Sequence, residues 1–315
     1  MPVWLQMTAA LSAALISGLM GIALIPFLEK YRFFDSDPEP ETGETASGNR
    51  VRPTMCGLLL IFGCISGLVL SSTLFLQTAD RTSTAFQTES RALWMRMGYA
   101  LLLGGAGFAL DYMKVKRRFL YRIPEFIQIG MVFLLSLAML KFLPEQSVLD
   151  FGFWKWNAGR LSNPVRAVLL ALAWKSMQGM EIHADGIGIT LNCTGLLFLT
   201  MILIMLKQNL LALYSLTAAG ACMGCFYWNL PPAKCRLGET GSYWLGGVLP
   251  VLCLAENQIY LLLLYMAVYL VNLMPVPFRK QTLLELMKQE SAWKKIGLMT
   301  GFAVFCEILS VMLNA

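Results

Sequence analysis

Long apolar runs, each separated from the next by a shorter polar segment, fill most of the 315-residue chain. A helix needs about 20 mostly apolar residues to cross the hydrocarbon core of a bilayer, and most of the runs come close to that length. The pattern predicts an all-α polytopic membrane protein with about ten transmembrane helices in a single integral membrane domain, residues 1–315. The predicted helices span residues 3–28, 55–76, 92–110, 126–143, 164–178, 189–206, 209–228, 242–255, 257–273 and 295–313.

The composition supports a membrane-embedded chain. It is 57% hydrophobic and 14% charged, whereas an average soluble domain contains about 25% charged residues. The first apolar run begins almost at residue 1 without a basic segment or a small-residue cleavage site, which favours a retained span over a signal peptide. The net charge of +6 needs no nucleic-acid partner, because Lys and Arg in cytoplasmic loops produce the same excess.

The basic residues gather in every second loop of the predicted bundle. Of the 25 Lys and Arg residues, 17 lie in or beside the loops after the first, third, fifth, seventh and ninth spans. Because cytoplasmic loops carry such an excess, these loops are predicted to face the cytoplasm and both termini to face outward. Every polar cluster with candidate chemistry falls on that same side, which predicts a cleft on the cytoplasmic face.

The eight cysteines lie mostly inside or beside apolar runs. Cys222 and Cys225 have the C-x-x-C spacing found in some metal and redox sites, but they fall within an apolar run that offers no second pair of ligands. For the cysteines of this chain, the sequence therefore favours buried small hydrophobes over metal ligands or disulfides.

An acid and a base three residues apart, Asp111 and Lys114, end the third predicted span. On a continuing helix these two side chains share a face, and an ionisable residue at a membrane boundary is a functional hypothesis by default. The alternative is an interfacial Asp followed by the basic run that fixes topology. The sequence favours neither interpretation.

A second cluster follows the short fifth span. Asp185, with Gly186 and Gly188 beside it, could ligate a cation or a sugar hydroxyl, but Asp-Gly is more often simply a turn. His183 is the only histidine. It could act as a base or contact a phosphate, although a lone interfacial histidine is more often a polar anchor.

A polar, turn-rich segment, residues 229–242, separates the seventh and eighth spans. Asn229 and Glu239 supply two oxygen ligands of the kind that Mg²⁺ prefers, with phosphates and waters completing the coordination. Lys234 and Arg236 between them could neutralise a diphosphate. The alternative is a proline-rich connector that carries ordinary basic topology signals.

Taken in order, these motifs resemble those of the polyprenyl-phosphate N-acetylhexosamine-1-phosphate transferases (glycosyltransferase family 4), nearest to the bacterial phospho-N-acetylmuramoyl-pentapeptide transferases. Residues 53–57, Pro-Thr-Met-Cys-Gly, are similar to P-T-M-G-G, and residues 107–115 follow G-F-x-D-D-Y-x-K-V. Residues 182–188 parallel N-x-x-D-G-x-D, and residues 229–242 follow N-x-x-P-A-x-x-x-x-G-D-T-G-S without a gap. The resemblance spans nearly the whole chain.

The resemblance implies an enzyme of the bacterial cytoplasmic membrane. Such enzymes move a phospho-sugar from a UDP-sugar to undecaprenyl phosphate, release UMP and use Mg²⁺, in peptidoglycan or envelope glycan synthesis. Besides membrane lipids, the implied partners are a second copy of the chain or another envelope-assembly protein. The implied site residues are Asp111, Lys114 and Asp185 for catalysis, Thr54, Asn229 and His183 for substrate binding, and Glu239 and Asn229 for the metal.

Four positions depart from the pattern of that family. Leu110 stands in place of the first Asp of the D-D pair, and Ile182 and Gly188 replace the Asn and second Asp of the next motif. Glu239 replaces the metal-binding Asp, which moves the carboxylate by about one carbon–carbon bond where catalytic geometry tolerates about 0.5 Å. The histidines that the family carries in its final loop are absent, since no histidine follows His183.

Three functional hypotheses follow. An active transferase is supported by the retained acids, Lys114 and Asn229. A non-catalytic paralogue that binds polyprenyl phosphate, a nucleotide-sugar or an envelope-assembly partner is supported by the replaced positions, since each missing electrostatic contact costs about 3 kcal/mol of transition-state stabilisation. A transporter or lipid scaffold fits the motif order poorly. The residues favour the second hypothesis, and the family's activity describes the ancestry and the substrate class.

Overall fold

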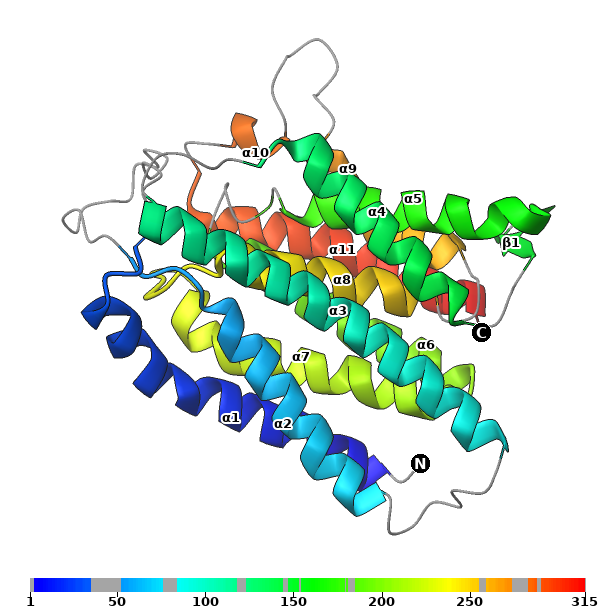
Figure 1. Ribbon diagram of the computed structural model, residues 1–315, viewed down its shortest axis with the longest axis horizontal. Helices are drawn as coiled ribbons and strands as arrows, with labels where there is room; N and C mark the ends of the chain where they lie inside the picture. The colour runs from blue at the N-terminus through cyan, green and yellow to red at the C-terminus, as the bar shows by residue number, and fades with distance from the viewer. Residues whose placement is uncertain are drawn as a thin grey trace.

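The computed structural model describes residues 3–34, 52–75, 84–117, 123–143, 147–152, 154–178, 180, 185–254, 259–273, 283–287 and 290–314. The long helices lie side by side in one bundle (Figure 1). In chain order the elements are α1 (Val3–Lys30), α2 (Gly57–Phe75), α3 (Thr84–Arg117), α4 (Glu125–Lys141), β1 (Val148–Asp150), β2 (Lys155–Asn157), η1 (Gly159–Leu161), α5 (Ser162–Gln178), α6 (Ile187–Met205), α7 (Asn209–Asn229), α8 (Gly238–Cys253), α9 (Ile259–Leu273), α10 (Leu283–Leu286) and α11 (Ala292–Asn314).

The long helices fall where the hydrophobic pattern predicts them. Within the described ranges, each predicted span overlaps one helix of at least 15 residues. Five of these helices, α1, α3, α6, α7 and α11, are long and apolar enough to cross a membrane. A helical, multi-pass membrane protein is therefore confirmed, whereas the full count of ten spans stays a prediction.

A short antiparallel hairpin departs from the predicted all-α architecture. β1 pairs with β2 so that Leu149 lies opposite Trp156, and Leu149 is fully buried. The Trp154 ring stacks against Phe151 and Trp156, with ring centroids 5.9 and 6.3 Å apart. Strands of three residues are too short to leave a readable alternation in the sequence, which explains why the hydrophobic pattern did not predict them.

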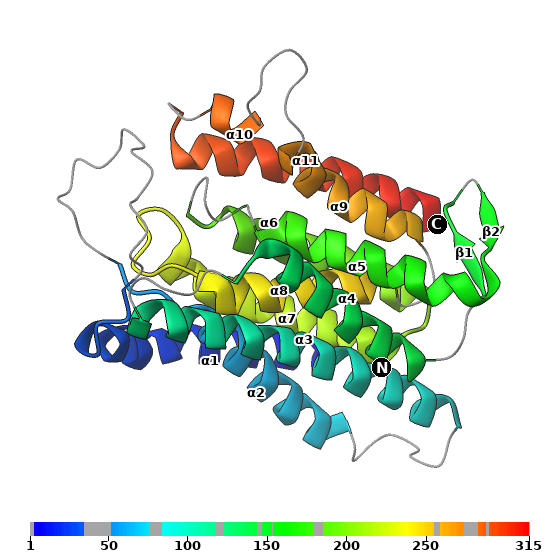
Figure 2. The ribbon, with the colours of Figure 1, turned by 45° about the horizontal axis from the view of Figure 1, so that its top comes forward.

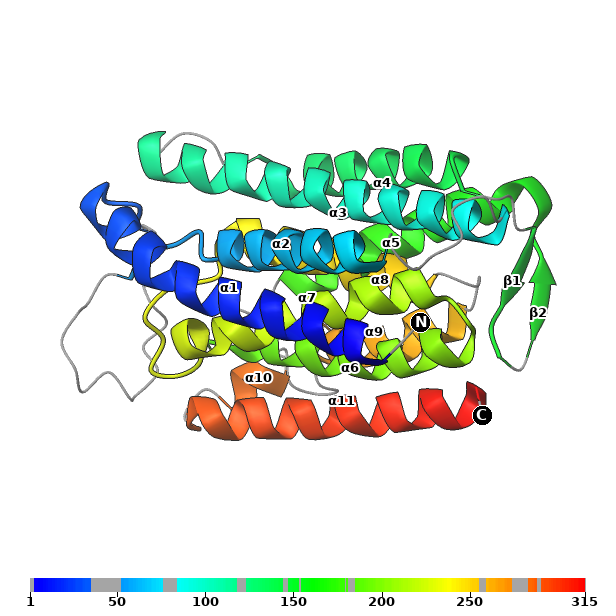
Figure 3. The same cartoon turned by 90° about the horizontal axis from the view of Figure 1, so that it is seen from below.

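Close packing of α1 on α7 depends on two glycines. A Cβ atom added at Gly220 would lie 2.3 Å from the carbonyl oxygen of Ala10, and one added at Gly224 would lie 2.2 Å from that of Ala14. Small residues four positions apart let membrane helices approach closely, so their backbones gain van der Waals contact. α2 packs beside α1 on the same face of the bundle (Figure 3).

The two ends of the bundle differ. Both termini and the β1–β2 hairpin lie at one end, whereas the loop between α7 and α8 lies at the other (Figures 1, 2 and 3). We call the end that carries the α7–α8 loop the site end. α3 ends there and α8 begins there, so residues distant in sequence meet at one place. The predicted topology, with both termini facing outward and the site end facing the cytoplasm, stays a prediction.

Candidate functional site

The segment before α2 pairs with the end of the α7–α8 loop through backbone hydrogen bonds. The Arg236 N–H donates to the Pro53 carbonyl at 2.9 Å, and the Cys56 N–H donates to the Arg236 carbonyl at 3.1 Å. The Gly57 N–H donates to the Leu237 carbonyl at 3.0 Å. Two of the sequence motifs are thereby joined side by side at the site end.

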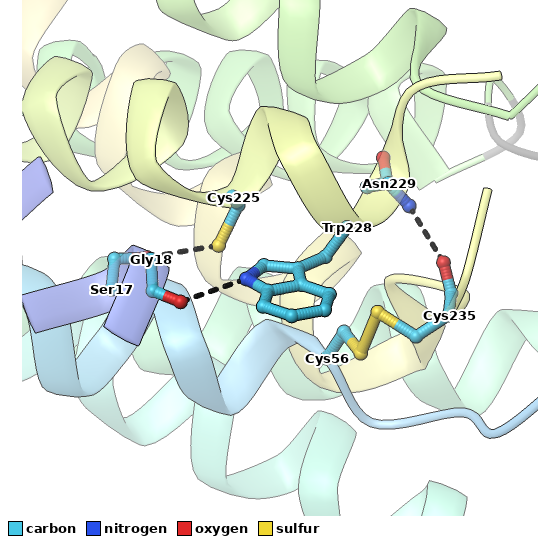
Figure 4. The surroundings of a disulfide bond; sticks show 7 residues. All are labelled: Ser17, Gly18, Cys56, Cys225, Trp228, Asn229 and Cys235. Atoms are coloured by element: carbon cyan, nitrogen blue, oxygen red, sulfur yellow. Dashed lines mark hydrogen bonds between the residues drawn. A yellow bond between two sulfur atoms is a disulfide. The ribbon is translucent and has the colours of Figure 1, made fainter. Parts of the chain in front are cut away.

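A disulfide between Cys56 and Cys235 crosses this pairing (Figure 4). The prediction of unpaired thiols is therefore wrong for these two residues, because both lie in polar segments that the fold brings together. It is confirmed for the other six cysteines, Cys64, Cys193, Cys222, Cys225, Cys253 and Cys306, which are free and buried.

Asp111 holds the first turn of α8. Its Oδ1 atom accepts a hydrogen bond from the Glu239 N–H at 3.0 Å. Its Oδ2 atom accepts from the Thr240 N–H at 2.9 Å and from the Thr240 hydroxyl at 2.7 Å. The first N–H groups of a helix have no partner within the helix and attract negative charge, so a buried carboxylate fits here. Leu110, at the position of the family's first Asp, packs in the apolar core instead.

Both carboxylate oxygens of Glu239 accept hydrogen bonds. Its Oε1 atom accepts from the Lys114 ammonium at 2.8 Å, and its Oε2 atom accepts from the Gln178 amide at 2.8 Å. α3 continues to Arg117, so Asp111 and Lys114 share a face of this helix, as the sequence predicts. Gln178 is a site residue that sequence reasoning missed. Gln178 is the last residue of α5. A polar side chain at the end of an apolar run, on the side where the other site residues lie, could have marked it as a candidate.

Two glycines allow this close arrangement. Gly238 has a φ of +73°, and a Cβ atom there would lie 2.6 Å from Asp111 Oδ2 and 2.7 Å from the Thr54 hydroxyl oxygen. At Gly107, a Cβ atom would lie 2.4 Å from the Glu239 carbonyl oxygen. The start of α8 therefore fits against α3 and the segment before α2 only because side chains are absent at these positions.

Thr54 and Asn229 each carry a buried polar atom without a hydrogen-bond partner, the Thr54 hydroxyl oxygen and Asn229 Oδ1. The Asn229 amide nitrogen donates to the Cys235 carbonyl at 3.3 Å, a bond visible in Figure 4. Most buried polar groups in proteins are satisfied, so each exception calls for an explanation. An unfilled ligand contact is one such explanation.

Asp185 forms an ion pair with Arg52, and both side chains are about one-quarter exposed, at 26% and 24%. The adjacent Gly186 lies against the end of α7, where a Cβ atom would be 3.2 Å from the Asn229 carbonyl oxygen. The structure thus places Asp185 beside the α7–α8 loop, paired with a cation that sequence reasoning did not single out. His183 and Ile182 lie outside the described residues.

The Lys234 ammonium packs against aromatic rings, so its position does not indicate a diphosphate site. The ammonium lies 3.6 Å from the centre of the Tyr227 ring and 5.0 Å from that of Trp228. Trp228 in turn donates through its indole nitrogen to the Gly18 carbonyl at 2.9 Å (Figure 4). Cation–π contact explains the position of Lys234 without a ligand and ties the loop to α1.

The donor set does not fit the Mg²⁺ ion that the resemblance implies. Both oxygens of Asp111 and both oxygens of Glu239 already accept hydrogen bonds. Within the ranges that the structure describes, no group of three or more His, Cys, Asp or Glu side chains could hold a metal ion. Mg²⁺ takes six ligands at about 2.0–2.1 Å in a strict octahedron, and the present donors hold both carboxylates in an arrangement that forms no such cluster.

Sequence comparison identifies relatives. A family model described as glycosyl transferase family 4 matches residues 93–257. Similar proteins include the phospho-N-acetylmuramoyl-pentapeptide-transferase of Rickettsia prowazekii, 26% identical over 271 residues that cover 79% of this chain and 70% of the relative. Those of Heliobacterium modesticaldum (26% identical, covering 85% and 80%) and Caldicellulosiruptor bescii (27% identical, covering 80% and 75%) match similarly. The family model covers more than half of the sequence, so this chain is a member of glycosyl transferase family 4.

Proposed function

We propose that the chain binds a polyprenyl phosphate and a UDP-linked sugar at the site end, and that it transfers the phospho-sugar poorly or not at all. The two ligand classes follow from membership of the family and from relatives named phospho-N-acetylmuramoyl-pentapeptide-transferase. The proposed setting is a bacterial cytoplasmic membrane with the site end facing the cytoplasm, as the basic loops predict.

One observation carries the proposal: the Glu239 carboxylate is bonded at one oxygen to Lys114 and at the other to Gln178. Phosphoryl transfer needs positive charge, from a metal ion or from cationic side chains, directed at the group that moves. Here the charge of Lys114 is paired with Glu239, and the Lys114 and Gln178 donors compete with a metal ion for the Glu239 oxygens. The arrangement supports binding more than transfer.

Two side chains are suited to the ligand contacts. A buried polar atom left without a partner costs about 1–3 kcal/mol, and the Thr54 hydroxyl oxygen and Asn229 Oδ1 are such atoms. A hydroxyl can donate to a phosphate oxygen, and an amide oxygen can accept from an N–H or O–H group of the nucleotide-sugar. We assign these roles to Thr54 and Asn229, with both contacts independent of a metal.

Active transfer is the second candidate function. It is favoured by the meeting of Asp111, Lys114 and Glu239 at the start of α8, and by the negative charge that Glu keeps where the family has Asp. Under this candidate, Lys114 leaves Glu239 and contacts the phosphates of the substrate. A homodimer or an envelope-assembly partner stays a prediction from the resemblance under either candidate.

The two candidates differ in UMP release. In lipid nanodiscs, the full-length protein should bind undecaprenyl phosphate equally well in Mg²⁺ and in EDTA, as measured by native mass spectrometry. With UDP-N-acetylmuramoyl-pentapeptide added, UMP release should be at least about 10³-fold below that of the Rickettsia prowazekii relative assayed in parallel. Mg²⁺-dependent release that is abolished in both Asp111→Asn and Glu239→Gln would instead establish active transfer.

Lys114 provides a test of the binding role alone. Lys114→Met leaves the Glu239 carboxylate without its cation, so the carboxylate should repel a ligand phosphate and weaken undecaprenyl phosphate binding about tenfold. Glu239→Gln in the same chain should restore most of the affinity, because it removes the repelling charge. Lys116→Met is the matched control, since Lys116 on the same helix lies over the Tyr112 ring. If the double variant binds as weakly as the single one, Lys114 contacts the ligand directly.

A further inference from the structure

The Cys56–Cys235 disulfide lies within the candidate site. Cys56 is two residues from Thr54 and directly precedes α2, and Cys235 is three residues before Gly238, where α8 begins. The two cysteines are 179 residues apart in sequence and are 2% and 0% exposed. The bond therefore joins the two segments that carry the proposed ligand contacts.

The contacts of Cys235 extend the effect of the bond into the loop. The Cys235 carbonyl accepts from the Asn229 amide at 3.3 Å, and the Cys235 N–H donates to the Trp228 carbonyl at 3.2 Å. Figure 4 shows the disulfide, Asn229 and Trp228 together at the end of α7. A movement of Cys235 away from Cys56 thus moves the amide whose oxygen we assign to the ligand.

The redox state of the other thiols sets this pair apart. The remaining six cysteines are free although all are buried, so the chain carries one bridged pair among unbridged thiols. In the proposed topology the site end faces a reducing compartment. Disulfides are rare there, and those that occur are usually transient and catalytic or redox-sensing.

We propose that the Cys56–Cys235 bond is a redox modification site on which a dithiol reductant acts, and that opening it lowers the affinity of the site for its phosphate ligand. The proposal rests on the proposed binding function. The class of partner is a protein or small molecule with two neighbouring thiols, because such a reductant completes the reaction without a further thiol.

The exchange balances within these two partners. A thiolate of the reductant attacks one sulfur of the bond and forms a mixed disulfide, while the other cysteine leaves as a thiolate and takes up a proton. The second thiol of the reductant loses its proton and attacks the mixed disulfide, which releases the remaining cysteine as a thiol. Two electrons pass to the protein, and the reductant ends as an internal disulfide.

Opening the bond should loosen the loop and leave the bundle intact. The three backbone hydrogen bonds between residues 236–237 and residues 53, 56 and 57 do not depend on it, so they keep the loop near α2 while the loss of the covalent tether lets it move more freely. Because both sulfurs are buried, the reductant reaches them only when the loop moves away from α2. A ligand held between these segments should therefore slow the reduction.

The test uses the full-length protein purified without reductant in lipid nanodiscs. Dithiothreitol treatment followed by alkylation and peptide mass spectrometry should find Cys56 and Cys235 newly alkylated. Undecaprenyl phosphate affinity should fall about tenfold, as expected when a preorganised loop is released, and saturating undecaprenyl phosphate should slow the reduction. Unchanged affinity after complete reduction overturns the proposal.

A double variant and one control separate this bond from other thiols. Cys56→Ala/Cys235→Ala should bind like the reduced protein and ignore dithiothreitol. Cys225→Ala, which removes a free thiol hydrogen-bonded to Ser17, should respond like the unmodified chain. A double variant that still responds to dithiothreitol contradicts the proposal.

A readout without ligand distinguishes failure of this proposal from failure of the proposed function. Hydrogen–deuterium exchange of residues 229–238 should become faster on reduction in the unmodified chain and should be equally fast, in either condition, in the double variant. If undecaprenyl phosphate binds in neither redox state, the binding function fails. If reduction leaves the hydrogen–deuterium exchange of residues 229–238 unchanged, the redox control of the loop is overturned, whether or not the ligand binds.

Discussion

Asp111→Ala is expected to lower the free energy of unfolding by about 3 kcal/mol, because it removes three hydrogen bonds to a charged, buried acceptor and leaves their donors without partners. The donors are the Glu239 N–H, the Thr240 N–H and the Thr240 hydroxyl. The loss falls on the first turn of α8, whose N–H groups no other residue of that helix can satisfy. Thermal and denaturant unfolding in detergent, followed by circular dichroism, measure the change.

Asp150→Ala is the matched control. Asp150 also accepts a backbone hydrogen bond, from the Gly152 N–H at 2.8 Å, and faces Lys155 at 3.5 Å. It lies on the β1–β2 hairpin, and its partner Lys155 is 70% exposed, so its loss should cost less than about 1 kcal/mol. Equal stability of the two variants would mean that other contacts hold the first turn of α8.

Gly107→Ala is expected to destabilise the protein by about 3 kcal/mol, the upper range for overpacking, and to abolish ligand binding. The added Cβ would lie 2.4 Å from the carbonyl oxygen of Glu239 and 2.7 Å from its carbonyl carbon. These are backbone atoms at the start of a helix, so they cannot rotate aside as a side chain would. α8 must move away from α3, which separates Glu239 from Lys114.

Gly105→Ala, two residues earlier on the same helix, tests the same change without the contact. A Cβ at Gly105 meets nothing within 4 Å. Since Ala favours a helix over Gly by about 1 kcal/mol, this variant should be as stable as the unmodified chain or slightly more stable. Comparison of the two thermal midpoints, and of undecaprenyl phosphate binding, checks both the sign and the cause. Destabilisation of both variants by the same amount would contradict the argument.

The sequence predicted the positions of the long helices well, and it erred where a helix continues outside the apolar run. α3 begins at Thr84 and ends at Arg117, although the apolar run covers residues 92–110. α8 begins at Gly238, within the polar, turn-rich segment 229–242 that precedes the predicted span 242–255. Hydropathy reports the part of a helix that lipid or core surrounds. The start of α8 depends on Asp111 from another helix, and no local pattern contains that contact.

At the site, the sequence predicted three of the residues that meet there but not all of their partners. The motif order led to Asp111, Lys114 and Glu239, which the structure brings together. Neither Gln178 nor Arg52 belongs to one of these motifs, and each meets its partner only through the fold. The Cys56–Cys235 bond was missed for a related reason. The two cysteines become neighbours only through the pairing of residues 53–57 with the α7–α8 loop.

The placement of the two chain ends has a practical consequence for labelling. Both leave the bundle at the end opposite the α7–α8 loop (Figure 1), and a helix such as α6, with 19 residues, is about 28 Å long. A fluorescent protein or an affinity tag fused at residue 1 or at residue 315 is therefore separated from the site by about one helix length. A compartment-specific reporter at either position shows which side of the membrane the termini face, and therefore which side the site end faces. Two independent fusions check each other.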